Sequence, residues 1–338
     1  MANFYDEYLE FWAVGNAKKQ DSRAVIHEEE LEWVETDQDT RTALMAAPEN
    51  GFATWGSEYL ISEIAPGWHT GKHEHGEEAI YIVEGEGFSV VNGVKYEWNK
   101  HSVLWMPFGS QHQHFNTGTT TARYFSAMAL HLEHWMGIGK LDQFDLKGPT
   151  DSYQDFTVST TGFDAQNRRI CLREEEQEER TLDDMSAEEM AEVSGEAIPI
   201  DPDGPRPTEM SRGGHRDFTR PLMDRGGKNG FQNKEVEIST LMGDQVGHHG
   251  GKHAHMEAVL YMVDGEGYSE VGGVKVPWKK GSLLHVQGPQ TPHQHFNTGN
   301  QRVEMLRAAP GMRFNFMQRI SKERFPYLWY SHRGVNES

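Results

Sequence analysis

Two long stretches of this chain repeat each other at a fixed distance. Residues 71–98 (GKHEHGEEAIYIVEGEGFSVVNGVKYEW) match residues 251–278 (GKHAHMEAVLYMVDGEGYSEVGGVKVPW) at an offset of 180 residues. The motif HQHFNTG follows in both copies, at 112–118 and at 293–299, where the offset has grown to 181. This period is far longer than the roughly 20–50 residues of a solenoid repeat. The repeat therefore predicts a whole domain that has been duplicated within one chain.

Each copy has the sequence pattern of short β-strands. β-branched and aromatic residues fill AIYIVEGEGFSVV, and VNG then gives a hairpin signal before VKYEW. SVLWMPFGSQHQHF adds two extended stretches around a Pro–Gly turn. Short strands at this spacing are typical of a sandwich or a small barrel, so the predicted class is all-β.

The repeat and the changes in composition around it divide the chain into five parts. In chain order we expect an N-terminal helical or extended arm (1–48), a first barrel (49–135), an inter-barrel linker (136–235), a second barrel (236–312) and a C-terminal helix (313–338). Thr181 followed by acidic residues is a helix start signal, so an acidic helix is predicted over 181–193 inside the linker. The helical termini leave room for a homo-oligomer and for a separate small subunit.

Charge and cysteine content exclude several kinds of partner and site. The net charge is −20, whereas a nucleic-acid partner or an anionic membrane surface requires a basic stripe. Cys171 is the only cysteine, which excludes an intramolecular disulfide and a Cys/His zinc cluster. MANFYDEYLEFW lacks the basic and apolar regions of a signal peptide, and no run of about 18 apolar residues is present. We expect a soluble cytoplasmic protein.

Four residues of the first copy form a candidate metal site. His73 and His75 are two apart, so on a strand both imidazoles point to the same face. Glu78 would need a local turn at Gly76 to join them, and His112 would arrive from a later strand. Three imidazoles and one carboxylate suit Fe(II), Mn(II), Ni(II) or Zn(II). On an octahedral ion they leave two positions open for chemistry.

These residues carry a family resemblance. The first copy resembles the two cupin motifs, which read here Gly67, His73, His75, Glu78 and Gly85, followed by Pro107, Gly109, His112 and Asn116. The resemblance covers both repeats. It implies a double-stranded β-helix barrel in each half of the chain, with the metal inside the barrel.

The second copy departs from the motif at the carboxylate. Its histidines are His253, His255 and His293, but the residue aligned with Glu78 is Ala258. Glu257 lies one position early, and a strand slip that made it a ligand would reverse which side chains face inward. The second site could bind metal through three histidines, bind it weakly or be empty. We expect the chemistry in the first barrel.

Other residues near the motifs have two readings each. His114, His295 and His69 are candidates for acid–base groups beside a metal-bound substrate or for groups that orient the metal ligands, or are polar residues at the barrel rim. Trp68, Trp105 and Phe115 are candidates to line a substrate pocket, or are packing residues of the core.

The ligand set and the two-barrel layout resemble those of ring-cleaving dioxygenases of the gentisate and hydroquinone type. That resemblance implies Fe(II), a phenolic substrate and O₂. The sequence has no GxGxxG after a strand and no P-loop, so no organic cofactor is predicted. The alternatives are a Mn(II) oxalate decarboxylase or oxidase, and a non-catalytic metal-binding or storage protein. Zn(II) is also compatible with the ligands.

The distribution of arginine bears on the substrate. Neither 51–118 nor 236–300 contains an arginine, the residue that commonly binds a carboxylate in a bidentate manner. Candidates would have to come from outside these windows, and Arg123, Arg302 and Arg307 are the nearest. This absence favours a neutral phenol such as hydroquinone over gentisate.

Overall fold

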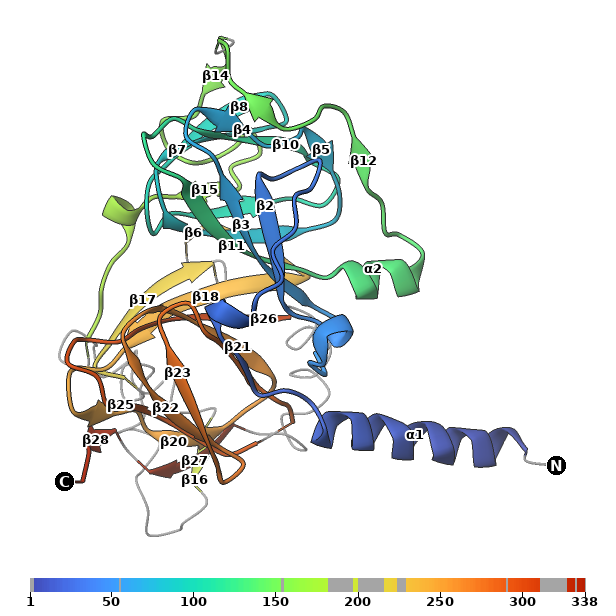
Figure 1. The fold of residues 1–338 in the computed structure, drawn as a ribbon, viewed down its shortest axis with the longest axis vertical. Helices are drawn as coiled ribbons and strands as arrows, with labels where there is room; N and C mark the ends of the chain where they lie inside the picture. Colours follow the sequence, from blue (N-terminus) through green and yellow to red (C-terminus); the bar gives the residue numbers. More distant parts are fainter. Residues whose placement is uncertain are drawn as a thin grey trace.

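The chain forms two β-sandwiches that pack against each other, one for each copy of the repeat (Figure 1). The computed structural model describes residues 3–54, 56–152, 155–181, 197–199, 216–223, 229–289, 291–310, 327–331 and 333–337. The all-β class is therefore confirmed. Each copy is a pair of open sheets of jelly-roll type, and the interior lies between the two sheets of the pair.

The first sandwich has a six-stranded sheet that faces the second sandwich and an eight-stranded sheet that faces away from it. In spatial order the six-stranded sheet contains β15 (Cys171–Leu172), β9 (Val103–Met106), β6 (Glu78–Glu84), β11 (Ala122–Met128), β3 (Glu58–Ile64) and β2 (Arg41–Ala46). The eight-stranded sheet contains β12 (Asp142–Gln143), β5 (His73–Glu74), β10 (Gln111–Asn116), β7 (Gly87–Val91), β8 (Val94–Trp98) and β14 (Thr157–Val158), with β4 (Trp68–His69) beside β10 and β13 (Gly148–Pro149) beside β4.

The second sandwich repeats this arrangement. Its six-stranded sheet contains β1 (Val25–Ile26), β24 (Leu283–Val286), β21 (Ala258–Asp264), β26 (Glu304–Pro310), β18 (Val236–Gly243) and β17 (Phe218–Met223). Its eight-stranded sheet contains β16 (Ala197–Pro199), β27 (Tyr327–Ser331), β20 (Lys252–Ala254), β25 (His293–Asn297), β19 (His248–His249) and β28 (Gly334–Val335), with β22 (Glu266–Val271) beside β25 and β23 (Val274–Lys279) beside β22.

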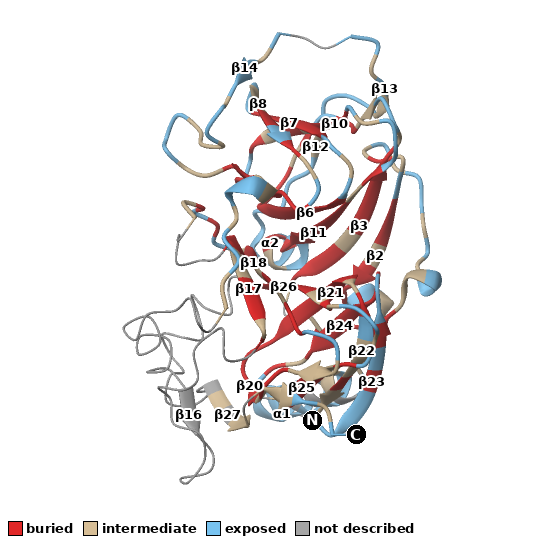
Figure 2. Cartoon of the chain, turned by 90° about the vertical axis from the view of Figure 1, so that its left-hand side faces the viewer, coloured by how far each residue is buried: buried red, intermediate tan, exposed pale blue. Residues whose placement is uncertain are grey.

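The two six-stranded sheets share a hydrophobic core where they meet, and Figure 2 shows this region as a band of buried strands. Strand alternation sends every second side chain of β6, β11 and β21 to this face. Phe125 stacks on Tyr59 within its own sandwich, with ring centroids 6.0 Å apart, and on Tyr261 of the other sandwich at 5.2 Å. The opposite face of each six-stranded sheet lines the interior of its own sandwich.

Segments outside the repeat complete the sheets. Strands from the expected arm and linker therefore belong to the sandwiches, although the five-part division separates them. β2 lies within the expected N-terminal arm and belongs to the first sandwich, whereas β1, earlier in the same arm, pairs with β24 of the second. β17 lies within the expected linker and pairs with β18. These edge strands carry no motif, so only their pairing partners identify them.

Helices are few in the described part of the chain. α1 (Phe4–Gln20) begins with Asn3, which forms a capping box with Asp6, and it projects away from both sandwiches (Figure 1). α2 (Leu130–Met136) follows β11 directly. Short 3₁₀ turns occur at Glu28–Glu30, Pro48–Asn50 and Glu174–Glu176. No helix among the described residues is long and apolar enough to cross a membrane.

The structure forms strands, and not the expected C-terminal helix, in the part of this segment that it describes. Tyr327–Ser331 forms β27, which pairs with β20, and Gly334–Val335 forms β28, which pairs with β19. Aromatic residues such as those in YLWYS fit a strand that completes a sheet, and this pairing overrides the helical spacing. The rest of that segment and residues 182–193 of the expected acidic helix lie outside the described residues.

Candidate metal centre

The structure brings the three histidines of the first copy together inside the first sandwich. His73 starts β5 and pairs with His112 on β10, while His75 follows β5 directly. The ring centroids of His73 and His112 are 4.2 Å apart, those of His75 and His112 4.7 Å, and those of His73 and His75 5.1 Å. All three side chains are buried. The period-two prediction that both histidines of HxH share a face therefore agrees with the geometry.

Backbone carbonyls fix the tautomer of each of these histidines. Nδ1 of His73 lies 2.9 Å from the Gly71 carbonyl oxygen, and Nδ1 of His112 lies 2.9 Å from that of Ser110. His75 makes the same contact at 3.0 Å with the residue that follows it. A carbonyl can only accept, so each Nδ1 carries the proton and each Nε2 keeps its lone pair. Nε2 of His112 is buried without a hydrogen-bond partner, as expected for an atom that binds a cation.

Glu78 supplies a carboxylate to the same place. Its Oε2 lies 3.5 Å from Nε2 of His75 and 3.7 Å from Nε2 of His112. A bend at Gly76 makes this possible, and a Cβ there would lie only 1.7 Å from a carboxylate oxygen of Glu133, so a larger residue would have to displace that side chain. Burial raises the pKa of Glu78 to about 8, although a hydrogen bond with Ser126 works against this.

Three Nε2 lone pairs and one carboxylate oxygen thus converge on one buried point. This donor set fits a divalent ion of intermediate softness. The four residues would hold the ion from two strands of one sheet and from the first residue of a strand in the other. The fit rests on the unpartnered Nε2 and on a carboxyl group that burial alone would keep protonated at neutral pH.

His114 lies beside this site but is held in the other tautomer. Indole Nε1 of Trp98 donates to Oγ of Ser89 at 3.0 Å, and this Oγ lies 2.7 Å from Nδ1 of His114. An indole can only donate, so the Ser89 hydroxyl proton is directed at Nδ1, and the imidazole proton resides on Nε2. A ligand atom of His114 lies within 4.8 Å of those of Glu78 and His112. His114 is therefore a hydrogen-bond donor beside the metal position rather than a ligand of the ion.

Two interior residues of this site were missed in the sequence. The hydroxyl of Tyr124, on β11, donates to Oδ1 of Asp39 at 2.5 Å. The ring of Tyr124 lies 5.6 Å from that of His114, and burial raises the pKa of Asp39 to about 6. Counting by two along β11 from Ser126, which contacts Glu78, would have found Tyr124. Asp39 precedes β2, outside the motifs, and carries no comparable signal.

Three of the predicted accessory residues are not brought to the site. Nε1 of Trp105 donates to Oε1 of Glu77 at 2.7 Å, on the strand face that points away from the ligands. Phe115 stacks on Phe88 with centroids 4.5 Å apart, on the outer face of β10, and His69 lies beside it at 5.5 Å. On β10 the period of two sends 112 and 114 inward and 115 outward.

Trp68 keeps its place as a candidate lining residue. It is half-buried and packs against the hydrophobic core of the first sandwich. Its position on β4 is two residues before Thr70, whose hydroxyl accepts a hydrogen bond from the backbone N–H of His114. The structure thus connects Trp68 with the strand that carries the interior histidines.

The second copy forms a histidine cluster with nearly the same shape. Ring centroids are 4.3 Å apart for His253 and His293, 4.7 Å for His255 and His293, and 5.1 Å for His253 and His255. Each Nδ1 again faces a backbone carbonyl. His295 accepts from Ser269, which accepts from Trp278, as in the first copy.

The carboxylate is absent from this second cluster among the described residues. Ala258 pairs with Val286 as Glu78 pairs with Met106, so the register does not slip. Glu257 points to the other face, where its Oε1 lies 2.9 Å from Nε2 of His285, and both side chains are fully buried. The structure therefore does not bring Glu257 to the three histidines.

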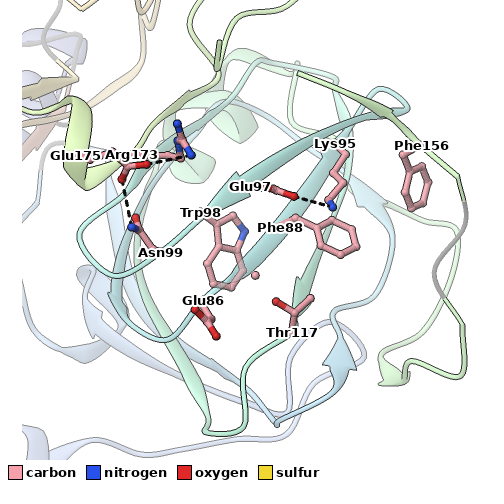
Figure 3. Close-up of a pocket in the computed structure, with 11 residues that line it drawn as sticks. Glu86, Phe88, Lys95, Glu97, Trp98, Asn99, Thr117, Phe156, Arg173 and Glu175 are labelled. Carbon is pink, nitrogen blue, oxygen red and sulfur yellow. Dashed lines mark hydrogen bonds and ion pairs between the residues drawn. The ribbon is translucent and has the colours of Figure 1, made fainter. Parts of the chain in front are cut away.

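A surface cleft of ≈ 440 Å³ lies at the end of the first sandwich, next to the Trp98 side chain (Figure 3). None of the predicted metal ligands lines it. The residues around it are mostly polar: Glu86, Gly87, Phe88, Lys95, Glu97, Trp98, Asn99, Thr117, Phe156, Arg173 and Glu175. The Trp98–Ser89–His114 chain of hydrogen bonds links the floor of this cleft to the interior.

Comparison with known proteins agrees with this geometry. Residues 60–128 and 240–308 each match the model of the cupin domain. No curated protein matches the chain in sequence. Salicylate 1,2-dioxygenase from Pseudoaminobacter salicylatoxidans, in its adducts with gentisate, superposes with a TM-score of 0.61 at 14% identity, over 99% of this chain and 93% of that one.

A second similar structure has a different named activity. A mutant of oxalate decarboxylase from Bacillus subtilis superposes with a TM-score of 0.59 at 12% identity, over 85% of this chain and 77% of that one. At such low identity these likenesses describe the fold alone. Together with the two matched segments, they describe a chain with two domains of the cupin fold, each of which contains a cluster of three histidines.

Proposed function

We propose that the first cupin domain is a non-heme Fe(II) dioxygenase that cleaves the ring of a hydroquinone-like or gentisate-like phenol with O₂. The observation that carries the proposal is the convergence of His73, His75, His112 and Glu78, with the donor His114 beside them. A bound Fe(II) would supply two open positions and the redox centre that couples oxidation of a phenol to reduction of O₂. Both oxygen atoms enter the product, so the reaction needs no organic cofactor or external reductant.

The polar residues of the interior have distinct roles in this proposal. Nε2–H of His114 donates a hydrogen bond to an oxygen atom of the bound substrate or of O₂. The hydroxyl of Tyr124 donates to Asp39, so its oxygen keeps lone pairs that accept a hydrogen bond from the phenol. Burial of these groups excludes bulk water and strengthens each of these contacts.

The substrate is expected to be a neutral phenol rather than a carboxylated one. Arg123, the nearest arginine after the first motif region, is held by Glu28 and Glu63. It lies on β11 one residue before Tyr124, so its side chain is on the outer face. No other charge of this sign among the described residues is placed at the first site. Hydroquinone is therefore the first substrate to test.

The alternative is an oxalate-decarboxylase-type Mn(II) enzyme, favoured by the comparable TM-score of that structure. The two proposals differ in metal and in gas exchange. Protein purified without oxygen should contain iron and take up O₂ when hydroquinone is added. Manganese in the site, with CO₂ release from oxalate and no O₂ uptake across a panel of phenols, would support the alternative and reject the dioxygenase. A storage protein would show neither activity.

We also propose that the chain forms a homo-oligomer through α1. Phe4, Tyr8 and Phe11 are exposed on one face of this helix, and its first turn is acidic whereas its last turn is basic. Antiparallel pairing of two copies would cover the apolar face and set acidic turn against basic turn. Light scattering after gel filtration should give a dimer or larger, and Phe4→Ser with Phe11→Ser should reduce it to a monomer. A monomeric parent protein would contradict this assignment and leave α1 for a separate subunit.

A further inference from the structure

The interior of the second cupin domain contains an arginine where the first domain has none. Arg307 lies on β26 and pairs with Leu260 of β21. Leu260 and Met305, two residues before Arg307, belong to the apolar cluster between the two sheets of the second sandwich. The alternate residues Leu306 and Ala308 belong instead to the core shared with the first sandwich. Strand alternation therefore directs Arg307 into the interior.

Arg307 takes the position of Ser126 in the first domain. Ser126 pairs with Ile80 as Arg307 pairs with Leu260, at the same offset of 181 residues that relates His112 to His293. Ser126 is the residue that hydrogen bonds to Glu78. Because Ala258 replaces Glu78, the carboxylate–hydroxyl pair of the first domain has become a methyl group and a guanidinium in the second.

A second buried arginine lies further inside the same domain. Arg216 is 1% exposed, pairs with Asp244 and lies with Nη2 3.5 Å from the Sδ atom of Met305. Sheet register equates Arg216 with Asp39, because Phe218 faces Gly243 as Arg41 faces Glu63. The negative Asp39 of the first interior thus corresponds to a positive group in the second.

Among the residues that the structure describes, the buried charges of this second interior pair with one another. Arg216 is paired with Asp244, and Nη1 of Arg307 lies 3.5 Å from Oε1 of Glu237, which has a 2% exposed side chain. These two described arginines and two described acids sum to zero. A divalent ion on three neutral imidazoles would therefore keep its full charge of two, whereas Glu78 offsets one charge in the first domain. A buried charge of this size requires an anion beside it.

We infer that the second cupin domain binds a small free carboxylate at its histidine cluster, with one carboxylate oxygen in the place of the Glu78 carboxylate and the other on Arg307. Ala258 supplies no carboxylate at the position of Glu78, so a ligand such as acetate would provide the missing carboxylate oxygen. Arg307 is only 19% exposed at its side chain, so its hydrogen bonds to a carboxylate are strengthened by the low local dielectric. This inference does not depend on the reaction of the first domain.

The test isolates the second domain and uses acetate as the probe. His73→Ala with His112→Ala removes the first metal site, and Co(II) is then added so that its visible absorption reports the second site alone. We expect one cobalt per chain and a saturable change of the spectrum with acetate. Arg307→Ser, which installs the residue of the first domain, should weaken acetate binding at least about tenfold. Ala258→Glu should give the carboxylate-bound spectrum without acetate and no response when acetate is added.

The control is Arg302→Ser, which removes an arginine of the same charge from the outer surface, where Arg302 pairs with Glu179. This variant should bind acetate as the parent does. Thermal unfolding of each variant shows whether it is folded, and Arg307→Gln provides a second, larger replacement if the serine variant is not. Absence of cobalt from the second domain, or acetate binding that is equal in the Arg307 variants and the parent, would overturn the inference.

Discussion

The two histidine clusters have almost the same geometry, but their surroundings differ in charge. The centroid distances of corresponding pairs agree within 0.1 Å: 4.2 and 4.3 Å, 4.7 and 4.7 Å, 5.1 and 5.1 Å. Backbone carbonyls orient each ring, so the shape of the cluster follows from the backbone and survived the duplication. Chemistry depends on the neighbouring side chains, which changed.

Four substitutions on the interior face account for this difference. At corresponding positions, the second domain has Ala258 for Glu78, Arg307 for Ser126, Met305 for Tyr124 and Arg216 for Asp39. Each one removes a proton-exchanging group or adds a fixed positive charge. In the two proposals above, the domains share one fold and separate catalysis from ligand binding through these interior side chains.

The largest effect is expected from the carboxylate at the first site. Glu78→Ala should lower metal affinity by more than about 100-fold and abolish ring cleavage. This loss is larger than the roughly 10–100-fold expected for a residue that only hydrogen bonds to a metal ligand. Glu257→Ala should leave the metal content of the first domain unchanged, because Glu257 contacts His285 instead. Metal analysis and O₂ uptake measure both. Equal losses from the two variants would show that the assignment of the ligands is wrong.

A smaller effect is expected from the histidine donors. His114→Ala should reduce kcat by about 10²–10⁴-fold while the metal is retained, because it removes a proton donor without removing a ligand. His295→Ala, its equivalent in the second domain, should leave kcat within a few-fold of the parent. Steady-state kinetics with metal analysis separates the two. Loss of metal from His114→Ala would identify this residue as a ligand and contradict the tautomer assignment.

The buried acid of the first domain is expected to make stability depend on pH. Burial raises the pKa of Asp39 from 3.8 to about 6, so stability in the metal-free protein falls as pH rises through this window. Asp39→Asn removes the penalty, and its advantage in unfolding free energy should grow by roughly 2 kcal/mol between pH 4 and pH 7. Urea unfolding at both pH values measures this advantage, and an advantage that is constant with pH would contradict the burial argument.

Asp244 provides the contrast in the second domain. Asp244→Asn leaves Arg216 buried without its partner, so the protein should be destabilised by about 3–5 kcal/mol at pH 7. The same urea experiment measures this loss. A variant that is as stable as the parent would show that the Arg216 charge is neutralised by another group.

The smallest effect should be the same in both domains. Trp98→Phe and Trp278→Phe each remove one indole hydrogen bond to a serine, at 3.0 and 2.8 Å respectively, and keep the aromatic packing. Each should cost about 1 kcal/mol of unfolding free energy. Only Trp98→Phe should also lower kcat, because only His114 is next to the proposed reaction site. An equal effect on kcat would place chemistry in both domains.

The repeat and the period of two predicted much of the first site. They predicted the all-β class, and they predicted that His73, His75, Glu78 and His112 would meet, including the turn at Gly76. The same counting places Trp105 and Phe115 on the outer faces of their strands, whereas the density of aromatic residues around the motifs suggests a pocket lining. The ligands could be predicted because neighbouring residues on regular strands determine them.

Residues that depend on distant pairing could not be predicted in this way. Asp39 and Arg216 precede β2 and β17, edge strands whose partners lie in the repeat but which carry no repeat themselves. The C-terminal segment was interpreted by its helical spacing, whereas β27 completes a sheet beside β20. In each of these places tertiary contacts determine the conformation, and the spacing of residues in the sequence does not predict those contacts.

The pairing of β1 with β24 has a consequence for synthesis on the ribosome. Val25 pairs with Leu284, so one of the first segments to emerge must wait for a partner made about 260 residues later. At roughly 5–20 residues per second this delay is some tens of seconds. All strands of the first domain have been synthesised long before then, whereas β1 still lacks β24, its partner strand in the second domain. A nascent chain of this protein would therefore expose β1, an edge strand of the second domain, without its partner for most of its synthesis, and a chaperone would bind this segment at that stage.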